Sequence, residues 1–403
     1  MIDQLVAAFG IIGMSCFAFG IISLAYFPLS IAFEFNRQKA TFRDYPFVSV
    51  VVPAYNEAKT IGRCVRSLLV SDYPQFEIIL VDDGSTDSTL EEMKKYLGHS
   101  IVKIISQTNG GKASALNHGY QLSKGDIIIF ADADGIFGTD TIKRLIDAFV
   151  DEKIACCCGN DAPIGLHFNI TKLQNLQAHV GTGYVRRALA YMNCLPIVSG
   201  NIGAFRRSVL DEIGLFKVGF IGEDLELTWR IHKAGYKVAF EPRALVRAEA
   251  PHTLKGLWNQ RVRWARGFIQ TIRIHHDLLF RKSAFGLYLP FNAIAMLIIP
   301  LLQLASMILL PILLMFMPGA VSMNMLALIG WLGIGFALFV TVFAIALDNA
   351  WKDLRYLWVI PLWIPYSLFI DAVMLWAIVL ELVGTEAKWN KVEGMELSTK
   401  TQR

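Results

Sequence analysis

The sequence lacks the glycine-rich phosphate-binding patterns of the most familiar nucleotide-binding enzymes. No Gly-x-Gly-x-x-Gly follows the first expected strand, and no Gly-x-x-x-x-Gly-Lys-Ser/Thr occurs anywhere in the 403 residues. These absences argue against a dinucleotide-dependent enzyme and against a P-loop NTPase. The six cysteines have no CxxC or CxxH spacing, which argues against a zinc site. Three of them are contiguous at 156–158, and we expect these to be small apolar strand residues in a reducing cytosol.

Charge is scarce as well, and it is unevenly distributed. Charged residues make up only 18% of the chain and hydrophobic residues 54%. No charge occurs from Leu5 to Phe33, and three more apolar stretches lie at about 288–316, 323–347 and 357–380. Each exceeds the roughly 20 residues that a helix needs to cross a bilayer, so a lipid bilayer is an expected partner. The net charge of +4 comes without a basic stripe, so nucleic acid is not an expected partner.

These stretches divide the chain into five parts. We expect an N-terminal transmembrane helix with its basic flank at 1–43, a cytosolic domain at 44–252, amphipathic interface helices at 253–285, three C-terminal transmembrane segments at 286–383 and a tail at 384–403. A cleavable signal peptide is the rival interpretation of the first stretch, but its apolar run is too long and no small-residue cleavage site follows it.

Basic residues gather where the globular domain meets the expected spans. The positive-inside rule therefore predicts a multi-pass protein of the plasma (inner) membrane with its domain in the cytosol. Simple parity places the C-terminal tail outside, unless the last segment, which contains Pro361 and Pro365, only re-enters the membrane. The basic residues in question are Arg37, Lys39, Arg43, Arg281, Lys282, Lys352 and Arg355.

The cytosolic part opens with strands and helices in regular alternation. Buried strands are expected at 47–52, 76–81, 101–105 and 126–130, with amphipathic helices between them. One of these helices should place Leu90, Met93 and Leu97 on a single face. Strands that are apolar on both faces and joined by helices predict an α/β domain with a mostly parallel sheet, whose ligands bind at the carboxyl ends of the strands.

Polar residues follow the expected strand ends. Asp132 and Asp134 come directly after the fourth strand, where an Asp-x-Asp pair offers hard oxygen ligands to a divalent cation, Mg²⁺ or Mn²⁺, on a diphosphate. A solvated pair of aspartates is the alternative. Asp83 follows the second strand and suits a base or ribose, while Ser85, Thr86 and Asp87 suit helix capping. The remaining candidates are Pro53, Ala54, Tyr55 and Glu57 after the first strand, and Lys112 after two glycines that could equally form a simple turn.

Two further clusters lie in the second half of the domain. Glu223 and Asp224 stand at the expected start of a helix, where they either stabilise the helix dipole or include a general base. Gln260, Arg263 and Trp264 lie in a basic amphipathic segment ahead of a membrane span. Such a segment either lies on the bilayer surface or binds a ligand.

Together these motifs resemble the membrane-integrated family-2 glycosyltransferases, the processive polysaccharide synthases. The ordered set is Asp82-Asp83-Gly84-Ser85, Asp132-Ala133-Asp134, Gly222-Glu223-Asp224 and Gln260-Arg261-Val262-Arg263-Trp264. Val198-Ser199-Gly200, Ala204-Phe205-Arg206-Arg207 and Leu254-Lys255-Gly256-Leu257-Trp258 look most similar to bacterial poly-N-acetylglucosamine synthases; chitin, hyaluronan and cellulose synthases are more distant. The chain departs from many members in having one expected N-terminal span instead of two, and Ala133 fills the middle of the Asp-x-Asp.

The resemblance implies a GT-A-type domain, a metal-dependent inverting reaction and a role for each candidate. Glu57 and Asp83, with Pro53, Ala54 and Tyr55, would contact the uridine, and Lys112 the nucleotide end. Asp132 and Asp134 would hold the metal ion on the UDP diphosphate, and Arg263 would stabilise the leaving group. Asp224 would be the general base, with Glu223 beside it in the substrate site, and Trp264 would form the floor of the acceptor site with Gln260.

The implied reaction extends a β-linked polysaccharide or oligosaccharide acceptor from a UDP-sugar donor, best taken as UDP-N-acetylglucosamine, and exports the product. Accessory export subunits are further expected partners. A non-processive enzyme that adds one sugar to a lipid acceptor would share every catalytic motif. A membrane receptor or scaffold that binds a nucleotide sugar without chemistry would have little need for Asp224.

Overall fold

The computed structural model of the protein describes residues 13–15, 20, 22–38, 40, 44–316, 319 and 323–385, without the side chains of 323 and 325–329. Part of the apolar stretch from Leu5 to Phe33 and residues 386–403 of the expected tail lie outside the described residues. The predictions for the first transmembrane helix and for the tail therefore fall largely on residues that the structure does not describe.

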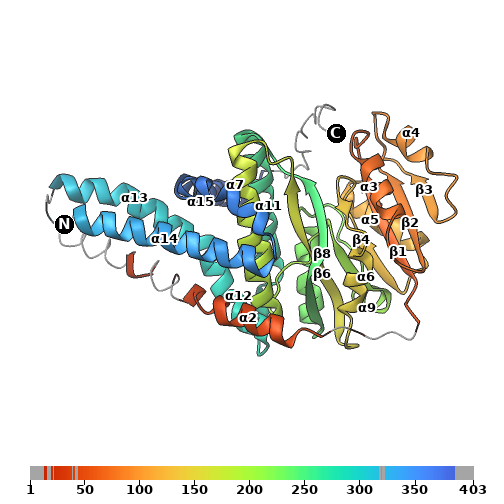
Figure 1. Ribbon diagram of the computed structural model, residues 1–403, viewed down its shortest axis with the longest axis horizontal. Helices are drawn as coiled ribbons and strands as arrows, with labels where there is room; N and C mark the ends of the chain where they lie inside the picture. The colour runs from red at the N-terminus through yellow and green to blue at the C-terminus, as the bar shows by residue number, and fades with distance from the viewer. Residues whose placement is uncertain are drawn as a thin grey trace.

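An eight-stranded sheet forms the centre of the α/β domain (Figure 1). The strand order is β3-β2-β1-β4-β7-β6-β8-β5. The strands are β1 (Val48–Ala54), β2 (Phe76–Asp82), β3 (Val102–Ser106), β4 (Ile127–Phe130), β5 (Ile136–Phe137), β6 (Ile154–Ile164), β7 (Gly203–Arg206) and β8 (Lys237–Glu249).

The first half of the sheet is parallel, as the sequence predicts. β1 pairs in parallel with β2 and β4, and β2 pairs in parallel with β3. Every residue of β1, β2 and β4 is buried because helices cover both faces of the sheet. α3 (Ile61–Leu69) and α6 (Thr141–Asp147) pack on one face, while α5 (Lys112–Leu122), α9 (Arg207–Ile213) and α10 (Glu223–Lys233) pack on the other.

The second half of the sheet is mixed. β7 runs antiparallel to both β4 and β6, and β6 pairs in parallel with the long strand β8. The carboxyl ends of β6 and β8 therefore reach the same edge of the sheet as those of β1, β2 and β4. The contiguous cysteines at 156–158 lie on β6 and are buried with free thiols, as predicted.

One helix is shorter than the sequence indicates. α4 (Thr89–Lys94) ends before Leu97, whose side chain is exposed, so the expected face of Leu90, Met93 and Leu97 does not form. Of the three residues expected to cap the helix, Asp87 does contact its start: Asp87 Oδ1 accepts a hydrogen bond from the N–H of Thr89, the first residue of α4, at 3.0 Å, whereas Ser85 accepts one from the backbone of Asn56. The hydrogen bonds of Ser85 and Asp87 thus join the loop after β1, the loop after β2 and the start of α4.

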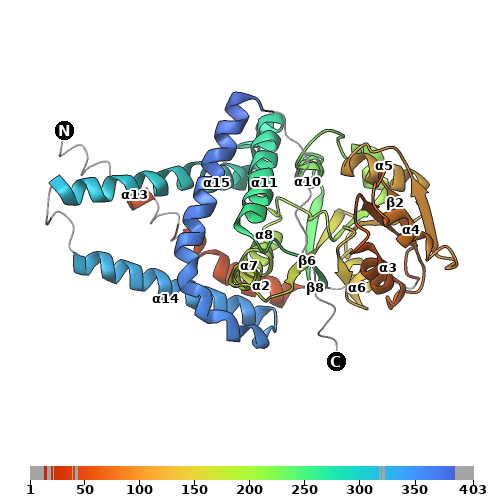
Figure 2. The same cartoon turned by 90° about the horizontal axis from the view of Figure 1, so that it is seen from above.

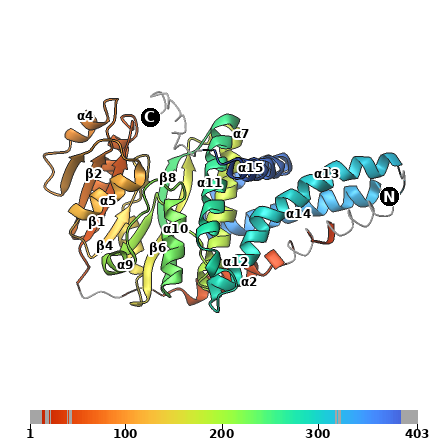
Figure 3. The ribbon, with the colours of Figure 1, turned by 180° about the vertical axis from the view of Figure 1, so that it is seen from behind.

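A layer of helices lies between the sheet and the most apolar part of the chain (Figures 2 and 3). It contains α7 (Asn169–Ala178), a π-helical turn at His179–Val185, α8 (Arg186–Tyr191) and α11 (Leu254–Ile274). α2 (Tyr26–Asn36) packs beside α8. The predicted Gln-x-x-Arg-Trp motif lies on α11, within this layer.

Three stretches of the described chain are long and apolar enough to cross a membrane: Ala284–Phe316, Gly330–Leu347 and Trp351–Val383. The first contains α12 (Ala284–Ala293) and α13 (Ile299–Phe316), and the second is the later part of α14 (Met323–Leu347). The third begins as a 3₁₀-helix at Trp351–Leu362 and continues as α15 (Trp363–Val383). α13 and α14 project away from the sheet in the same direction (Figures 1 and 2).

Candidate active site

The loops after β1 and β2 are fixed to each other at the carboxyl edge of the sheet. Asn56 adopts a left-handed backbone with φ 56°, which asparagine tolerates better than most residues. Its side-chain oxygen accepts a hydrogen bond from the N–H of Thr86 at 2.8 Å, and its own N–H donates to Ser85 Oγ at 3.0 Å. This pairing brings the predicted residues Pro53, Ala54, Tyr55 and Glu57 to the same edge as Asp83.

Asp83 holds the loop that precedes α5. Its Oδ1 accepts hydrogen bonds from Gln107 Nε2 at 2.7 Å and from the N–H of Gly110 at 2.9 Å, and its Oδ2 accepts from the N–H of Gly111 at 2.9 Å. Gly111 has φ 84°, a conformation that glycine adopts without strain. Asp83 therefore positions the start of α5, and with it Lys112, while its contact with a uridine stays a prediction.

Lys112 connects two of the predicted motifs. Its Nζ lies 2.6 Å from Asp132 Oδ1 and 3.7 Å from Glu223 Oε1. Burial alone disfavours a charged amine, but the carboxylates of Asp132 and Glu223 outweigh it and raise the pKa of Lys112 above its usual range. The lysine is therefore a fixed cation between the Asp-x-Asp pair and the first turn of α10.

A group of carboxylates surrounds Asp134. Burial, together with the neighbouring carboxylates of Asp132 and Glu57, raises the pKa of Asp134 to about 7. Glu249 at the end of β8 contributes to the same effect, and it forms an ion pair with Arg63 at 2.5 Å. Sequence reasoning missed Glu249, because only the pairing of β6 with β8 brings it to this edge.

Asp224 stands at the start of α10, as the sequence predicts. Its Oδ2 accepts a hydrogen bond from the N–H of Gly200 at 3.2 Å, and its Oδ1 accepts from the N–H of Leu225 at 2.8 Å. A Cβ at Gly200 would lie only 3.0 Å from Lys112 Nζ and 3.4 Å from Asp224 Oδ2. The glycine thus allows the backbone to approach both charged groups. Burial, partly offset by Lys112, raises the pKa of the neighbouring Glu223 to about 7.

α11 brings the Gln-x-x-Arg-Trp residues to this site. Gly222 and Gly267 allow α10 and α11 to touch, since a Cβ on Gly222 would lie 3.1 Å from the Cα of Gly267. Arg263 is close enough to favour the charged form of Glu223. Half of the Trp264 side chain is exposed, and the guanidinium of Arg261 lies 4.2 Å from its ring centroid. Gln260 lies one turn before Trp264 on the same helix.

Sequence reasoning also missed a partly buried ion pair close to Asp224. Arg186 Nη1 lies 3.0 Å from Asp161 Oδ1 and donates to Cys158 Sγ at 3.5 Å. The N–H of Ser199 donates to the same sulfur at 3.4 Å. Although burial opposes a charge on the guanidinium, Cys158, Asp161 and Asp224 together raise the pKa of Arg186. No local motif marks this arginine, because its partners come from β6 and, in the case of Asp224, from α10.

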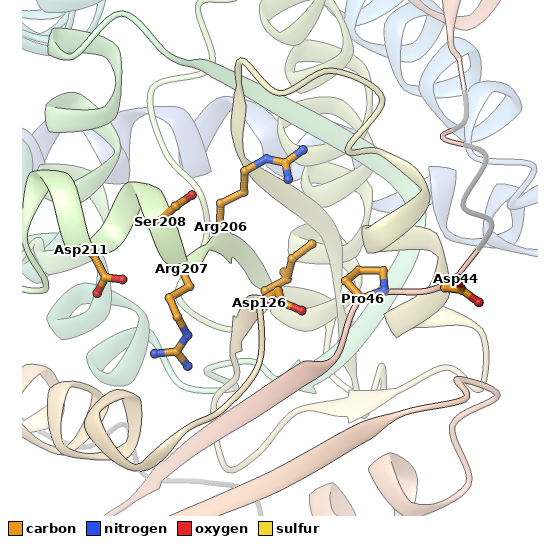
Figure 4. A pocket seen from close by; sticks show the side chains of 8 residues that line it. Asp44, Pro46, Asp126, Arg206, Arg207, Ser208 and Asp211 are labelled. Carbon is orange, nitrogen blue, oxygen red and sulfur yellow. The ribbon is translucent and has the colours of Figure 1, made fainter.

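A separate cavity of about 380 Å³ lies at the opposite edge of the sheet (Figure 4). Its arginines already have protein partners: Arg206 donates to the carbonyls of Ile154 and Asp151, and Arg207 donates to Gly125 O and Ser123 Oγ. These bonds fix the ends of β4, β6 and β7. The Arg206-Arg207 pair therefore acts as a structural clamp and not as part of the candidate active site.

Comparison with known proteins agrees with the geometry. Residues 49–214 match the family described as glycosyl transferase family 2. The chain is 31% identical over 254 residues to a poly-beta-1,6-N-acetyl-D-glucosamine synthase of Staphylococcus epidermidis, a match that covers 61% of this chain and 60% of that protein. It is 29% identical over 267 residues to the synthase of the same name from Staphylococcus aureus strain COL, covering 66% of this chain and 65% of that protein. The chain thus matches about three fifths of the length of these relatives.

A solved structure has a similar fold over nearly the whole chain. It is the mannosyltransferase PcManGT from Pyrobaculum calidifontis in complex with GDP-Man and Mn²⁺, with a TM-score of 0.69 and 21% identity, covering 95% of this chain and 100% of that one. The similarity confirms the predicted GT-A-like architecture, a mixed and mostly parallel α/β domain followed by long apolar helices.

Proposed function

The chain belongs to glycosyl transferase family 2 over residues 49–214, and on this basis we propose that it extends a β-linked polysaccharide from a UDP-sugar, with inversion at the transferred carbon. UDP-N-acetylglucosamine is the proposed donor, because the similar staphylococcal proteins are named as synthases of a polymer of that sugar. The general activity, a family-2 glycosyltransferase with membrane helices, is the premise; the donor, the polymer and its export are the proposal.

The ion-paired Lys112 is the observation that carries the proposal. It lies between Asp132 of the Asp-x-Asp pair and Glu223 at the start of α10, and its Nζ lies against Gly200, which is bonded to Asp224. These contacts gather the nucleotide end and the base into one site. A receptor that only binds a nucleotide sugar has no need for an acid placed beside the reacting end, so this arrangement favours an enzyme.

Asp83, Lys112 and the loop after β1 form the proposed donor site. Asp83 Oδ1 accepts hydrogen bonds from Gln107 and Gly110 and its Oδ2 accepts one from Gly111, which leaves one lone pair of Oδ2 for a base N–H. Glu57, Tyr55, Ala54 and Pro53 would form the other wall at the end of β1. Lys112 and Arg263 would stabilise negative charge on the departing diphosphate.

The acidic groups around Asp134 fit a divalent cation. Burial and neighbouring carboxylates raise the pKa of Asp134 to about 7, which indicates a site where negative charge lacks a compensating cation. Within the described part of the chain, no group of three or more His, Cys, Asp or Glu residues is arranged to hold a metal alone. Asp132 and Asp134 would therefore hold Mg²⁺ or Mn²⁺ together with diphosphate oxygens. A bound cation would supply Lewis-acid stabilisation of the diphosphate charge.

Asp224 is the proposed general base. Hydrogen bonds from the N–H groups of Gly200 and Leu225 orient its carboxylate. It would accept the proton of the acceptor hydroxyl while that oxygen attacks the anomeric carbon of the donor and the diphosphate leaves. Trp264, half-exposed on α11, would offer its ring to the apolar face of the terminal acceptor sugar, with Gln260 beside it.

We further propose that the protein lies in the plasma (inner) membrane with the sheet domain in the cytosol, where nucleotide sugars are made. The polymer would leave between the apolar helices, with accessory export subunits on the far side. Basic residues at the domain ends of the spans support this orientation by the positive-inside rule.

A donor panel tests the proposal. Membranes that contain the full chain are incubated separately with UDP-N-acetylglucosamine, UDP-glucose, UDP-glucuronic acid and GDP-mannose, and nucleoside diphosphate release is measured with and without a chelator. We expect release from UDP-N-acetylglucosamine only, loss of release on chelation, and a product of high molecular weight that a glycanase degrades. The Asp224→Asn variant is the matched control for chemistry.

Other outcomes would overturn parts of the proposal. If a single labelled sugar is recovered in the lipid extract, the acceptor is a lipid and the enzyme does not extend a polymer. Release of GDP from GDP-mannose instead of UDP from a UDP-sugar would contradict the proposed donor. Unchanged activity in the presence of the chelator would contradict the proposed metal ion.

A further inference from the structure

We propose that α15 (Trp363–Val383) does not cross the membrane but lies flat in the cytosolic leaflet, so that the C-terminal tail stays on the side of the sheet domain. At about 1.5 Å per residue a helix of this length, 21 residues, could span the hydrocarbon core. Length and composition therefore do not distinguish the two placements. The contacts of α15 with its neighbours do.

α15 lies alongside α11 from one end to the other. Near its start, the ring of Phe369 lies 5.5 Å from that of Trp258 on α11. Near its end, Glu381 accepts hydrogen bonds from Arg266 Nε at 2.7 Å and from Gln270 Nε2 at 2.9 Å. Residues later in α15 thus contact residues later in α11, so the two helices run in the same direction.

The chain leaving α15 is also bound to α11. Gly384 ends the helix in a left-handed conformation with φ 73°, and the carbonyl of Thr385 accepts a hydrogen bond from Arg266 Nη2 at 2.6 Å. The apolar contact between the helices is continuous between these ends. It joins Trp258, Val262, Ala265 and Ile269 of α11 with Phe369, Val373, Met374, Ala377 and Ile378 of α15.

α11 cannot be a membrane span. It carries five cations, Lys255, Arg261, Arg263, Arg266 and Arg273, each of which costs about 2.5 to 3.5 kcal/mol or more at the bilayer centre. It also packs on α10 through Gly267, next to the candidate base. If α15 spanned the bilayer, its partner helix would have to span with it, so both ends of α15 lie on the side of α11.

The orientation of the helices agrees with this placement. α15 runs across α13 and α14, near the ends that face the sheet, instead of along them (Figures 1 and 2). If α13 and α14 follow the membrane normal, α15 lies in the membrane plane.

The exposed face of α15 fits the acyl chains of that leaflet. Ile364 is 51% exposed, Leu375 43% and Leu382 78%, and their spacing of 11 and 7 residues places all three on one face of the helix. Val379 and Trp376 extend the same apolar surface, and α15 contains neither lysine nor arginine. A bilayer is the partner that such a continuous apolar face next to α13 requires.

A depth series tests the placement directly. Cysteines at 364, 375 and 382 are spin-labelled one at a time in the full chain in lipid vesicles, and depth is read from collisions with oxygen and with a water-soluble nickel complex. We expect the same depth at all three positions. If α15 spans, 364 and 382 are separated by about 27 Å along the membrane normal, both labels are shallow and 375 is deepest, which would overturn the proposal.

A topology assay gives a second, independent readout. Single cysteines at Thr385, at Gly319 between α13 and α14, and at exposed Lys94 in the sheet domain are treated with an impermeant maleimide before and after permeabilisation, in a chain with Cys16 replaced by alanine. The other five cysteines are buried. We expect the cysteines at 385 and 94 to react with the maleimide only after permeabilisation, and the cysteine at 319 to react before it. Reaction of the cysteine at 385 before permeabilisation, as at 319, would refute the flat placement.

This inference rests on the proposed membrane location, and the two can fail separately. If 319 is also protected, the proposed crossing by α13 and α14 fails, while the depth series alone still decides how α15 lies.

Discussion

Lys112 and Asp83 make different contacts at the proposed nucleotide end of the site. Asp83 accepts hydrogen bonds from the turn before α5, whereas Lys112 forms ion pairs with Asp132 and Glu223. A buried charge loses several kcal/mol of hydration, and here three neighbouring carboxylates offset that loss. The lysine is therefore held in place before any donor arrives, which reduces the reorganisation needed during reaction.

The general base gives the most direct prediction at this scale. Asp224→Asn keeps the shape of the side chain but removes the proton acceptor, so we expect kcat to fall by about 10²- to 10⁴-fold with the Kd for UDP nearly unchanged. Turnover by UDP release and UDP binding by calorimetry check this, with exposed Glu91→Gln as the control. Normal turnover of the variant would exclude the base assignment.

Arg186 is predicted to be a positioning residue for that base. Its guanidinium forms a partly buried ion pair with Asp161 and lies close enough to Asp224 for their charges to interact. Arg186→Gln should lower kcat several-fold and move the acidic limb of the kcat–pH profile by about one pH unit to higher pH, because a nearby cation favours an ionised carboxylate. Arg186→Lys should keep most of the profile.

These two variants separate an electrostatic role from a merely structural one. Loss of the ion pair with Asp161 also lowers stability, so the stability of both variants is measured alongside. Equal loss of activity in both, with an unchanged pH profile, would contradict the electrostatic role.

Trp264 is predicted to control product length. Trp264→Ala removes the proposed stacking surface, so we expect shorter products while hydrolysis of the donor is partly retained. Trp264→Phe keeps an aromatic face and should recover most of the length. Size analysis of labelled product checks both variants; full-length polymer from the alanine variant would show that acceptor binding does not depend on this ring.

At the scale of elements, the contact between α10 and α11 places the candidate base close to the helix that carries the Gln-x-x-Arg-Trp motif. Gly222 and Gly267 meet backbone to backbone, which brings the start of α10 against the middle of α11. The candidate base and the Gln-x-x-Arg-Trp motif are far apart in the sequence, and this contact fixes the distance between them. The two glycines are therefore needed for close packing of the helices and not for flexibility of the backbone.

Gly267→Ala should disturb this alignment. The new Cβ would lie 3.1 Å from the Cα of Gly222, and backbone cannot move aside as a flexible side chain can. We expect a loss of stability of about 1 to 3 kcal/mol and a lower kcat, with little effect on UDP binding. Gly98→Ala, where a Cβ would meet nothing within 4 Å, is the control, and unchanged kcat at Gly267→Ala would show that the spacing is not critical.

At the scale of the whole molecule, a buried ionic network joins the sheet domain to the apolar helices. Arg187 pairs with Glu34 of α2 at 2.6 Å and with Asp348, just after α14, at 2.7 Å. His179 bonds to Asp348 at 2.6 Å and to Asp353 at 3.0 Å. Three segments far apart in the chain, around residues 34, 179–187 and 348–353, are thus held at one point.

The charge of His179 predicts how this junction responds to pH. Burial opposes protonation, but hydrogen bonds to Asp348 and Asp353 outweigh it and raise the pKa of His179 to about 9, from about 6.5 in an unfolded chain. Because the folded pKa is the higher one, the stabilisation is complete below pH 6.5 and is lost as pH rises towards 9.

We expect the Tm of the protein in nanodiscs to fall over this interval more steeply than that of His179→Gln. Exposed His99→Gln is the control and should follow the natural chain. If His179→Gln and the natural chain lose stability in parallel between pH 6.5 and 9, the protonated His179 does not contribute.

The sequence by itself determined the class of the molecule. Apolar runs, strand and helix alternation and the ordered acidic motifs predict the parallel part of the sheet, the helix start at Glu223 and the candidate residues, because each of these is a local pattern of burial or capping. Even so, the local apolar spacing overextended α4 to Leu97: the helix ends at Lys94 and Leu97 is exposed, because spacing alone does not show whether the core reaches that residue.

Tertiary structure alone decided which of these patterns meet. The placement of Glu249 beside Asp134, of Arg186 beside Asp224 and of α15 along α11 depends on pairings between segments that are distant in the sequence. Hydropathy reports how apolar a helix is, but the orientation of the helix relative to the membrane is set by the segments that it packs against. For this reason the apolar sequence of α15 is equally suited to spanning the membrane and to lying flat, and only its ties to the charged helix α11 separate the two.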